Sequence, residues 1–369
     1  MKKKINLVFL SLILALVGFL SIITVSCASK IKEITGNVSF YVLSIGSGNF
    51  TFLEKDGHAV VMDCGTGLNS GGDSLETETD ALNTGYWGNY ANKTDADNII
   101  NFMKNTANVK VIDAIFISHK HTDHYNTLKY LVESFEVGTI VAPTDSKGLE
   151  TAVKQWKPSG NTIVDTIFSK TYDFLGGTFE NLTAYSSKKV VKSLYTNTDP
   201  NAVSMVLRFK VNGEVFMLPG DMEDNTAVIR DSKFRKAAAS QKVDVFLLPH
   251  HGSQNGATDL IPLIGNKEKS PKHVIISGTD NLNGFEPWAA KRNAITNAQG
   301  PIGMLLNTYS KDKREYIHIT GAVNYNVLNE FGDHVDKENT ESTFEYKFSE
   351  GIWNFVVHEE NIANGFRVK

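Results

Sequence analysis

The segment Ser118–His124, with the sequence SHKHTDH, holds three histidines and an aspartate. It follows the run Val111–Ile117, in which only Asp113 is not apolar. A short apolar run bounded by polar residues predicts a buried strand, and the helical spacing of apolar residues from Leu128 onward predicts a helix. Open α/β sheets place their functional sites in such strand-to-helix loops. We therefore expect an α/β protein whose site includes this loop.

The side chains of this loop are typical metal ligands. Zinc and related divalent ions bind imidazole nitrogen and carboxylate oxygen. The chain has only ten histidines in 369 residues, so three in one loop favour a metal site over a polar surface loop. The candidate ligands here are His119, His121, Asp123 and His124.

Two further strands are expected to end in ligand-type residues. The alternating hairpin Val203–Leu218 turns at an Asn-Gly pair, a strong hairpin signal, and leads into Asp221. The apolar run Val243–Leu248 leads into His250 and His251. Independent loops that meet in one place are the pattern expected of a metal-dependent hydrolase.

The rest of the chain has the same mixed character. Further strands are expected at Val38–Ile45, Phe50–Glu54, Ala59–Met62, Thr139–Ala142, Thr162–Phe168, Phe179–Tyr185, His273–Ser277, Ile302–Leu306 and Tyr316–Thr320, with a terminal hairpin at Ser342–Ser349 and Ile352–His358. Helices are expected at Asp95–Asn105, Gly148–Trp156, 222–239 and Trp288–Asn297, and polar loops at Leu68–Thr94 and Ser186–Pro200. Asp63, at a strand end, is expected to hydrogen-bond loop backbone, with a ligand role as the weaker alternative. His318, His334 and His358 are expected to be surface or hydrogen-bonded histidines.

The N-terminal residues 1–27 are typical of a targeting segment. Lys2, Lys3 and Lys4 precede the almost wholly apolar run Ile5–Val25. The segment resembles a bacterial lipoprotein signal with Cys27 as the lipidated residue, and an uncleaved membrane anchor or a secretory signal cut near Ala28 are the alternatives. Each of these places residues 28–369, which we expect to form a single domain, outside the cytoplasm and, in two cases, on the membrane.

The net charge and the cysteine content exclude two features: a chain that attracts polyanions by its overall charge, and a disulfide framework. The formal net charge is −4, and about −7 without the leader. Attraction of a polyanionic substrate would therefore depend on bound metal and on local lysines such as Lys188, Lys189 and Lys192. Cys64 is the only cysteine besides Cys27, so a lipidated Cys27 leaves no disulfide framework.

The order of these motifs resembles the metallo-β-lactamase superfamily. The resemblance implies an α/β fold, an αββα sandwich of two mixed β-sheets flanked by helices. It implies that Asp221 bridges two metal ions, with His119 and His121 on the first. It also implies Asp123 and His124 on the second, together with one histidine of the His250–His251 pair. Because neighbouring residues of extended backbone point opposite ways, we expect one ligand from the pair, His250, and a catalytic contact to substrate or leaving group from His251.

A finer resemblance is to the extracytoplasmic hydrolase domain of ComEC/Rec2-type competence proteins. It depends on the stretches Asn201–Ser204, Leu218–Asp221 and Pro249–Ser253, and more loosely on Gly46–Asn49 and Met62–Gly65. It implies Asn201, Ser204 and Ser253 as substrate-binding residues. Two departures are evident: no histidine lies between His124 and Asp221, and Glu286 stands where that group has a histidine before proline.

Together these features predict an extracytoplasmic metal-dependent hydrolase. The resemblance favours a phosphodiesterase or nuclease with one or two Zn²⁺ ions, or Mn²⁺, and with nucleic acid as a candidate substrate. Asp123 would both bind metal and orient the attacking water. The alternatives are a phosphorylcholine or teichoic-type esterase, a lactonase or β-lactamase, and a catalytically weak surface-binding lipoprotein.

Overall fold

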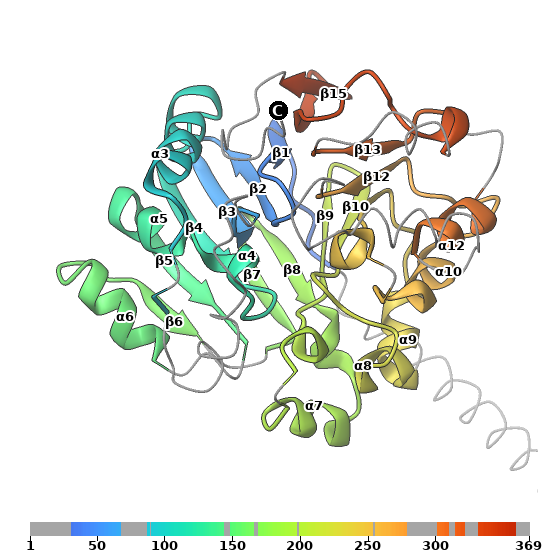
Figure 1. Cartoon of the computed structure of the whole chain (residues 1–369), viewed down its shortest axis with the longest axis horizontal. Coiled ribbons are helices and arrows are strands. Elements are labelled where there is room, and N and C mark those ends of the chain that lie inside the picture. The colour runs from blue at the N-terminus through green and yellow to red at the C-terminus, as the bar shows by residue number, and fades with distance from the viewer. Residues whose placement is uncertain are drawn as a thin grey trace, which may run out of the picture.

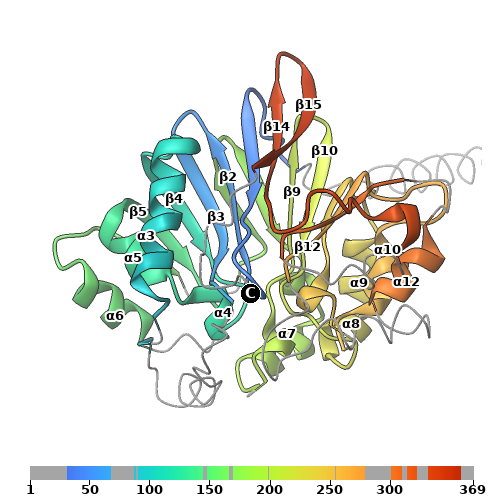
Figure 2. The same cartoon turned by 45° about the horizontal axis from the view of Figure 1, so that its top comes forward.

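The protein is built from two β-sheets that lie face to face, with helices on the outer side of each sheet (Figures 1 and 2). The structure, a computed structural model, describes residues 31–67, 87–88, 90–143, 148–165, 169–197, 199–253, 255–278, 301–309, 314–321 and 331–358. The predicted αββα arrangement is confirmed.

The first sheet has the strand order β15-β14-β1-β2-β3-β4-β5-β6. Its strands are β1 (Val38–Val42), β2 (Phe50–Lys55), β3 (His58–Cys64), β4 (Val111–Phe116), β5 (Glu136–Val141), β6 (Ile163–Asp165), β14 (Thr343–Ser349) and β15 (Ile352–His358). Pairing is antiparallel from β15 to β3 and parallel from β3 to β6, so the sheet is mixed.

The second sheet has the order β13-β12-β11-β10-β9-β8-β7. Its strands are β7 (Thr171–Phe174), β8 (Gly177–Asn181), β9 (Leu207–Val211), β10 (Glu214–Leu218), β11 (Val245–Leu247), β12 (His273–Ile276) and β13 (Ile317–Ile319). Pairing is parallel from β13 to β10 and antiparallel from β10 to β7.

Helices cover the two outer faces. The first sheet carries α3 (Lys93–Asn101), which continues as a π-helical turn (Phe102–Thr106), α5 (Leu128–Ser134) and α6 (Leu149–Trp156). The second carries α8 (Ala227–Arg230), α9 (Ser232–Ala238), α10 (Ile261–Ile264) and α12 (Pro301–Thr308). None of the helices in these described ranges is long and apolar enough to span a membrane.

The core between the sheets follows from the period-two pattern of the strands. Leu207, Phe209 and Val211 face inward, and Phe209 stacks on Phe216 with ring centroids 5.0 Å apart. Arg208, on the outer face of β9, forms a buried pair with Glu180 at 2.7 Å. The alternation seen in the sequence thus divides the inner core from the helix-covered face.

Two element predictions were wrong. Residues 302–306 belong to α12 and do not form a strand, because a short apolar run fits either a buried strand or a buried helix. The expected loop Ser186–Pro200 contains the helix α7 (Lys188–Leu194). Two strand boundaries also differ. The hairpin expected from Val203 begins with β9 at Leu207, and Leu182–Tyr185 form a 3₁₀ turn where strand had been expected.

Several predictions concern residues outside the described ranges. These are the leader 1–27 with Cys27, most of Leu68–Thr94, the departure at Glu286 and the helix Trp288–Asn297.

Candidate metal centre

Three strand ends position the candidate ligands. The histidine-rich loop follows β4 and runs into the short helix α4 (Thr122–Tyr125), while Asp221 follows β10 and the histidine pair follows β11. Backbone hydrogen bonds join these loops to one another and to the segment before β9: the His250 amide donates to Gly220 O (3.1 Å), and the Met205 amide donates to Ser118 O (2.9 Å). Residues from both sheets therefore meet at one edge of the sandwich.

Glycine allows the loops to approach this closely. A Cβ atom on Gly65 would lie 1.9 Å from the carbonyl carbon of Asp123, and one on Gly220 would lie 2.8 Å from Ser118 Cβ. Gly220 also has a φ of 57°, in the left-handed region that favours glycine. The loop that carries Asp123 is thus packed directly on the backbone that follows β3.

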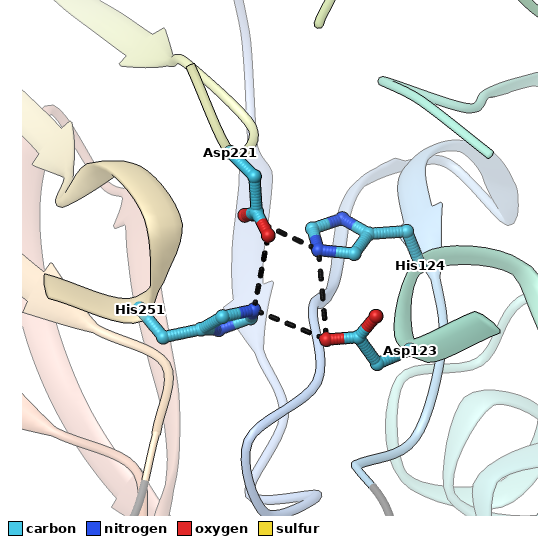
Figure 3. Close-up of side chains that lie close together, drawn as sticks. All are labelled: Asp123, His124, Asp221 and His251. Atoms are coloured by element: carbon cyan, nitrogen blue, oxygen red, sulfur yellow. Dashed lines mark ion pairs between the residues drawn. The ribbon is translucent and has the colours of Figure 1, made fainter. Parts of the chain in front are cut away.

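One group of donors consists of Asp123, His124, Asp221 and His251, whose ligand atoms all lie within 4.8 Å of one another (Figure 3). His124 Nε2 lies 3.2 Å from Asp221 Oδ1, and His251 Nε2 lies 3.3 Å from Asp123 Oδ2 and 3.6 Å from Asp221 Oδ2. Four convergent nitrogen and oxygen donors match the ligand number of a zinc site.

A second group consists of His119, His121 and Asp221. His119 Nε2 lies 3.7 Å from Asp221 Oδ2, so the two groups share the carboxylate of Asp221. A shared carboxylate is the arrangement by which one aspartate can bridge two ions.

Outer partners orient the imidazole rings. Ser118 Oγ donates its only hydrogen to Asp63 Oδ2 (2.8 Å). The hydroxyl oxygen of Ser118 therefore accepts from His119 Nδ1 (3.0 Å). His124 Nδ1 lies 2.9 Å from Asp63 Oδ2, and His251 Nδ1 lies 2.6 Å from the carbonyl oxygen of Ser277. Since carboxylate and carbonyl oxygens only accept, each Nδ1 is a donor, so in the neutral ring each Nε2 has the lone pair that binds a metal.

The Nε2 atoms of these rings show whether the residues fit a metal ion. Nε2 of His119, His124 and His251 is buried and has no hydrogen-bond partner. A buried polar atom without a partner is costly, and divalent cations bound by the two groups would satisfy all three. A metal-binding histidine typically has its other nitrogen bonded to a carboxylate or carbonyl, as here. The donor set therefore fits a divalent metal site.

Charge in the cluster favours the ligand form of the carboxylates. Burial raises the pKa of Asp221, but the imidazoles of His124, His251 and His250 outweigh it and hold that pKa well below its usual range. Burial lowers the pKa of His119, with further lowering from His124 and His121, and so keeps this ring neutral. A deprotonated aspartate and a neutral imidazole are the forms that bind metal.

The histidine pair is arranged differently from the expectation. His251 belongs to the four-donor group, whereas His250 lies outside both groups. Both residues have φ of 52°, so the backbone is left-handed here and not extended. The expectation that His250 is the ligand and His251 the substrate contact assumed extended backbone. The structure instead places His251 among the four donors, and His250 is not one of them.

The expected substrate-binding residues lie close by. Asn201 Nδ2 donates to Glu223 Oε1 (2.8 Å), and Ser204 is fully buried with Oγ lacking a hydrogen-bond partner. The Ser253 amide donates to His250 O (2.7 Å) and closes the turn. Sequence reasoning missed Glu223, which lies 3.5 Å from His250 Nδ1, and its position two residues after Asp221 was the available signal.

Comparison with known proteins gives the family. The family model described as "Metallo-beta-lactamase superfamily" matches residues 43–269. No curated protein matches the sequence. Solved structures similar to this chain include the metallo-beta-lactamase fold protein YhfI from Bacillus subtilis. It is 12% identical, the match covers 65% of this chain and 85% of YhfI, and the TM-score is 0.35.

Two others are the metallo hydrolase Igni18 from Ignicoccus hospitalis and a putative metal-dependent hydrolase from Parabacteroides distasonis. Igni18 is 15% identical, with 70% of this chain and 91% of that chain covered and a TM-score of 0.35. The Parabacteroides protein is 14% identical, with 73% and 95% covered and a TM-score of 0.35. The family model alone spans well over half of the chain. With its two layered sheets and converging donors, the chain thus belongs to the metallo-beta-lactamase superfamily and is a metal-dependent hydrolase of that fold.

Proposed function

We propose that this hydrolase is an extracytoplasmic phosphodiesterase that uses two divalent metal ions. We expect these ions to be Zn²⁺, with Mn²⁺ as the alternative. The observation that carries the proposal is the pair of adjoining donor groups that share Asp221. Two ions bridged by one carboxylate suit in-line displacement at phosphorus, because they can stabilise both the attacking and the leaving oxygen.

The four-donor group is assigned Asp123, His124, Asp221 and His251, and the other group His119, His121 and Asp221. When bound, the ions would lower the pKa of water and stabilise charge on the phosphoryl oxygens. Asp123 has a second role. Its backbone is fixed, because the Asn49 amide donates to Asp123 O (3.0 Å), so its carboxylate can accept a hydrogen bond from the attacking water and orient it.

The surroundings support an anionic substrate. β9 begins opposite the end of β10, since Leu207 pairs with Leu218, so the segment before β9 lies at the edge that holds Asp221. That segment includes α7 (Figure 2). Lys188, Lys189 and Lys192 of this helix are exposed. A cationic helix on this segment would attract a phosphodiester despite the negative net charge of the chain. Asn201, Ser204 and Ser253 remain the proposed substrate-binding residues.

The test is hydrolysis by the full chain, purified in detergent and loaded with Zn²⁺ or Mn²⁺. We expect cleavage of bis(p-nitrophenyl) phosphate or single-stranded DNA. Asp221→Ala should abolish it, and Asp123→Ala should lower kcat by about 10²–10⁴-fold. Asp113→Asn, at the opposite end of β4, is the matched control and should leave the rate unchanged.

Other substrate classes are outcomes of the same screen. A metal-loaded, folded chain that leaves phosphodiesters intact but opens a lactone or β-lactam would overturn the substrate class. Release of choline phosphate or of teichoic-type fragments would identify the esterase alternative. A folded chain that holds little metal would favour the binding lipoprotein.

The proposed location outside the cytoplasm is supported by the basic and apolar leader. Lipid labelling that depends on Cys27 would establish membrane anchoring, and a Cys27→Ser variant is the control.

A further inference from the structure

The two donor groups are unequal. Among the residues that the structure describes, the group of Asp123, His124, Asp221 and His251 has four side chains, whereas the group of His119 and His121 has only the shared Asp221 besides its histidines. The sequence contains no histidine between His124 and Asp221 that could complete the smaller group. An ion there would have two imidazoles and a carboxylate oxygen that it shares with its neighbour.

His250 lies next to this incomplete group. Its Nε2 lies 3.7 Å from Asp221 Oδ2, the same oxygen that lies 3.7 Å from His119 Nε2. The His250 side chain is buried, with 11% of its surface exposed. Asp221 Oδ2 is thus the atom around which His119, His250 and His251 converge, because His251 Nε2 also lies 3.6 Å from it.

The other nitrogen of His250 is backed by a carboxylate. Nδ1 lies 3.5 Å from Glu223 Oε1. That oxygen is itself fixed by two amides, since it accepts from Asn201 Nδ2 (2.8 Å) and from Asn255 Nδ2 (2.6 Å). Glu223 thus lies beside Nδ1 without hydrogen-bonding to it. In a metal-binding histidine this nitrogen typically donates to such a carboxylate, and a small rotation of the ring would allow it here.

The backbone turns both rings toward Asp221. His250 and His251 each have φ of 52°, with ψ of 48° and 17°. Left-handed conformation is unfavourable for a non-glycine residue, and such strain persists where function requires it. In an extended chain the two rings would point opposite ways. Here both Nε2 atoms lie within 3.7 Å of Asp221 Oδ2.

We infer that the two histidines serve different ions: His251 belongs to the four-donor site, and His250 completes the site of His119 and His121 in place of the histidine that the chain lacks. This inference rests on the proposed two-metal function. It makes Glu223 a positioning residue that holds the His250 ring.

Metal binding tests the inference independently of activity. We would measure the affinities of the full chain for two Zn²⁺ ions by competition with a chromophoric chelator, and the absorption spectrum after Co²⁺ substitution. The variants are His250→Asn, His251→Asn and His119→Asn, because asparagine tolerates the left-handed backbone of the first two positions. His58→Asn, on β3 far from the site, is the matched control.

The expected result is that His250→Asn and His119→Asn both lose the weaker ion and keep the tighter one. His251→Asn should instead lose the tighter ion, and His58→Asn should bind both as the wild type does. Glu223→Gln should weaken only the weaker ion, by about 10–100-fold.

Two failures are distinguishable. If the wild type binds two ions and His250→Asn also binds both with unchanged affinity while KM rises, His250 contacts substrate and the inference is wrong. If the wild type binds no more than one ion, the two-metal proposal itself fails. Thermal unfolding of each variant without metal shows whether a lost ion reflects loss of the fold.

Discussion

At the scale of single residues, Asp63 organises the metal loop although it is not in either donor group. Its Oδ1 accepts from the Ser118 amide (2.6 Å), and its Oδ2 accepts from Ser118 Oγ (2.8 Å) and Asn49 Nδ2 (3.0 Å). The same Oδ2 lies 2.9 Å from His124 Nδ1. One buried carboxylate thus fixes the loop backbone and the ring of a candidate ligand.

Asp63→Asn should therefore weaken metal binding. An amide at this position removes the negative charge beside His124. Its NH₂ group would also face the groups that donate to Asp63, so we expect zinc affinity to fall about 10–100-fold. Chelator competition measures this. Asp113→Asn, which disrupts a pair with His58 on the surface, is the control and should change nothing. Equal affinities in both variants would show that Asp63 has no role beyond the fold.

Residue-level sequence reasoning predicted the hydrogen bonds of Asp63 to loop backbone but not its contact with His124. It also could not show which histidine of the pair joins which donor group. Their positions depend on the left-handed backbone of two successive residues, His250 and His251, and the sequence does not predict that conformation. Which histidine joins which donor group is a property of the folded turn.

At the scale of elements, the loops depend on close backbone packing more than on side chains. A Cβ on Gly65 would overlap the Asp123 backbone at 1.9 Å, and one on Gly48 would lie 2.5 Å from the Gly67 amide nitrogen. Backbone atoms cannot move aside by changing rotamer. The β1–β2 turn, the end of β3 and the metal loop are therefore interlocked.

Gly65→Ala should displace the metal loop. We expect loss of metal binding together with a lower Tm, because the overlap can be relieved only by shifting residues 123 and 124. Gly213→Ala is the matched control: its φ is 88°, but a Cβ there meets nothing within 4 Å. That variant should lose only about 1–2 kcal/mol through strain and should bind metal normally. Normal metal binding by Gly65→Ala would contradict the packing argument.

The N-terminus of α9 supplies a stability prediction. Asp231 accepts from the amides of Lys233 (2.9 Å) and Phe234 (3.1 Å) and so caps the helix. Burial raises the pKa of Asp231, but hydrogen bonds from Ser187 and these amides outweigh it and lower that pKa. Asp231→Ala should cost about 0.5–2 kcal/mol in the free energy of unfolding at pH 7.

The pH dependence follows from the direction of this shift. A lowered folded-state pKa gives stability that is complete above the unfolded value of about 3.9 and is lost as the pH falls through the folded value. Urea unfolding at pH 7 and near pH 3 measures it: the difference between wild type and Asp231→Ala should shrink at the lower pH. A difference that is the same at both would exclude the charged cap.

Element prediction from sequence succeeded where periodicity and turn chemistry agreed. The hairpin of β9 and β10 turns at Asn212 with a φ of 43°, and the terminal hairpin of β14 and β15 lies where it was expected. It failed at α12, where an apolar run has no period to distinguish strand from helix. It also failed at α7, whose exposed lysines carry no core pattern.

At the scale of the whole molecule, the candidate metal centre joins two layers. The loop after β4 belongs to the first sheet, and the loops after β10 and β11 belong to the second. Asp123 and His124 thus face Asp221 and His251 across the junction of the sheets (Figure 3). An ion bound there would crosslink the halves of the sandwich, so metal binding should contribute to the stability of the fold.

Removal of metal should consequently lower the Tm of the whole protein. A ligand that binds only the folded state stabilises it by RT ln(1 + [L]/Kd), about 4 kcal/mol at a free concentration of about 1,000 times Kd. We therefore expect Tm to fall by several degrees in chelator and to rise with the logarithm of free Zn²⁺ in metal buffers. Asp221→Asn, which removes the shared carboxylate, should show no rise, whereas His58→Asn should follow the wild type. If the wild type binds Zn²⁺ by direct analysis and its Tm does not respond, the ion binds the unfolded chain equally well, and the centre does not hold the two sheets together.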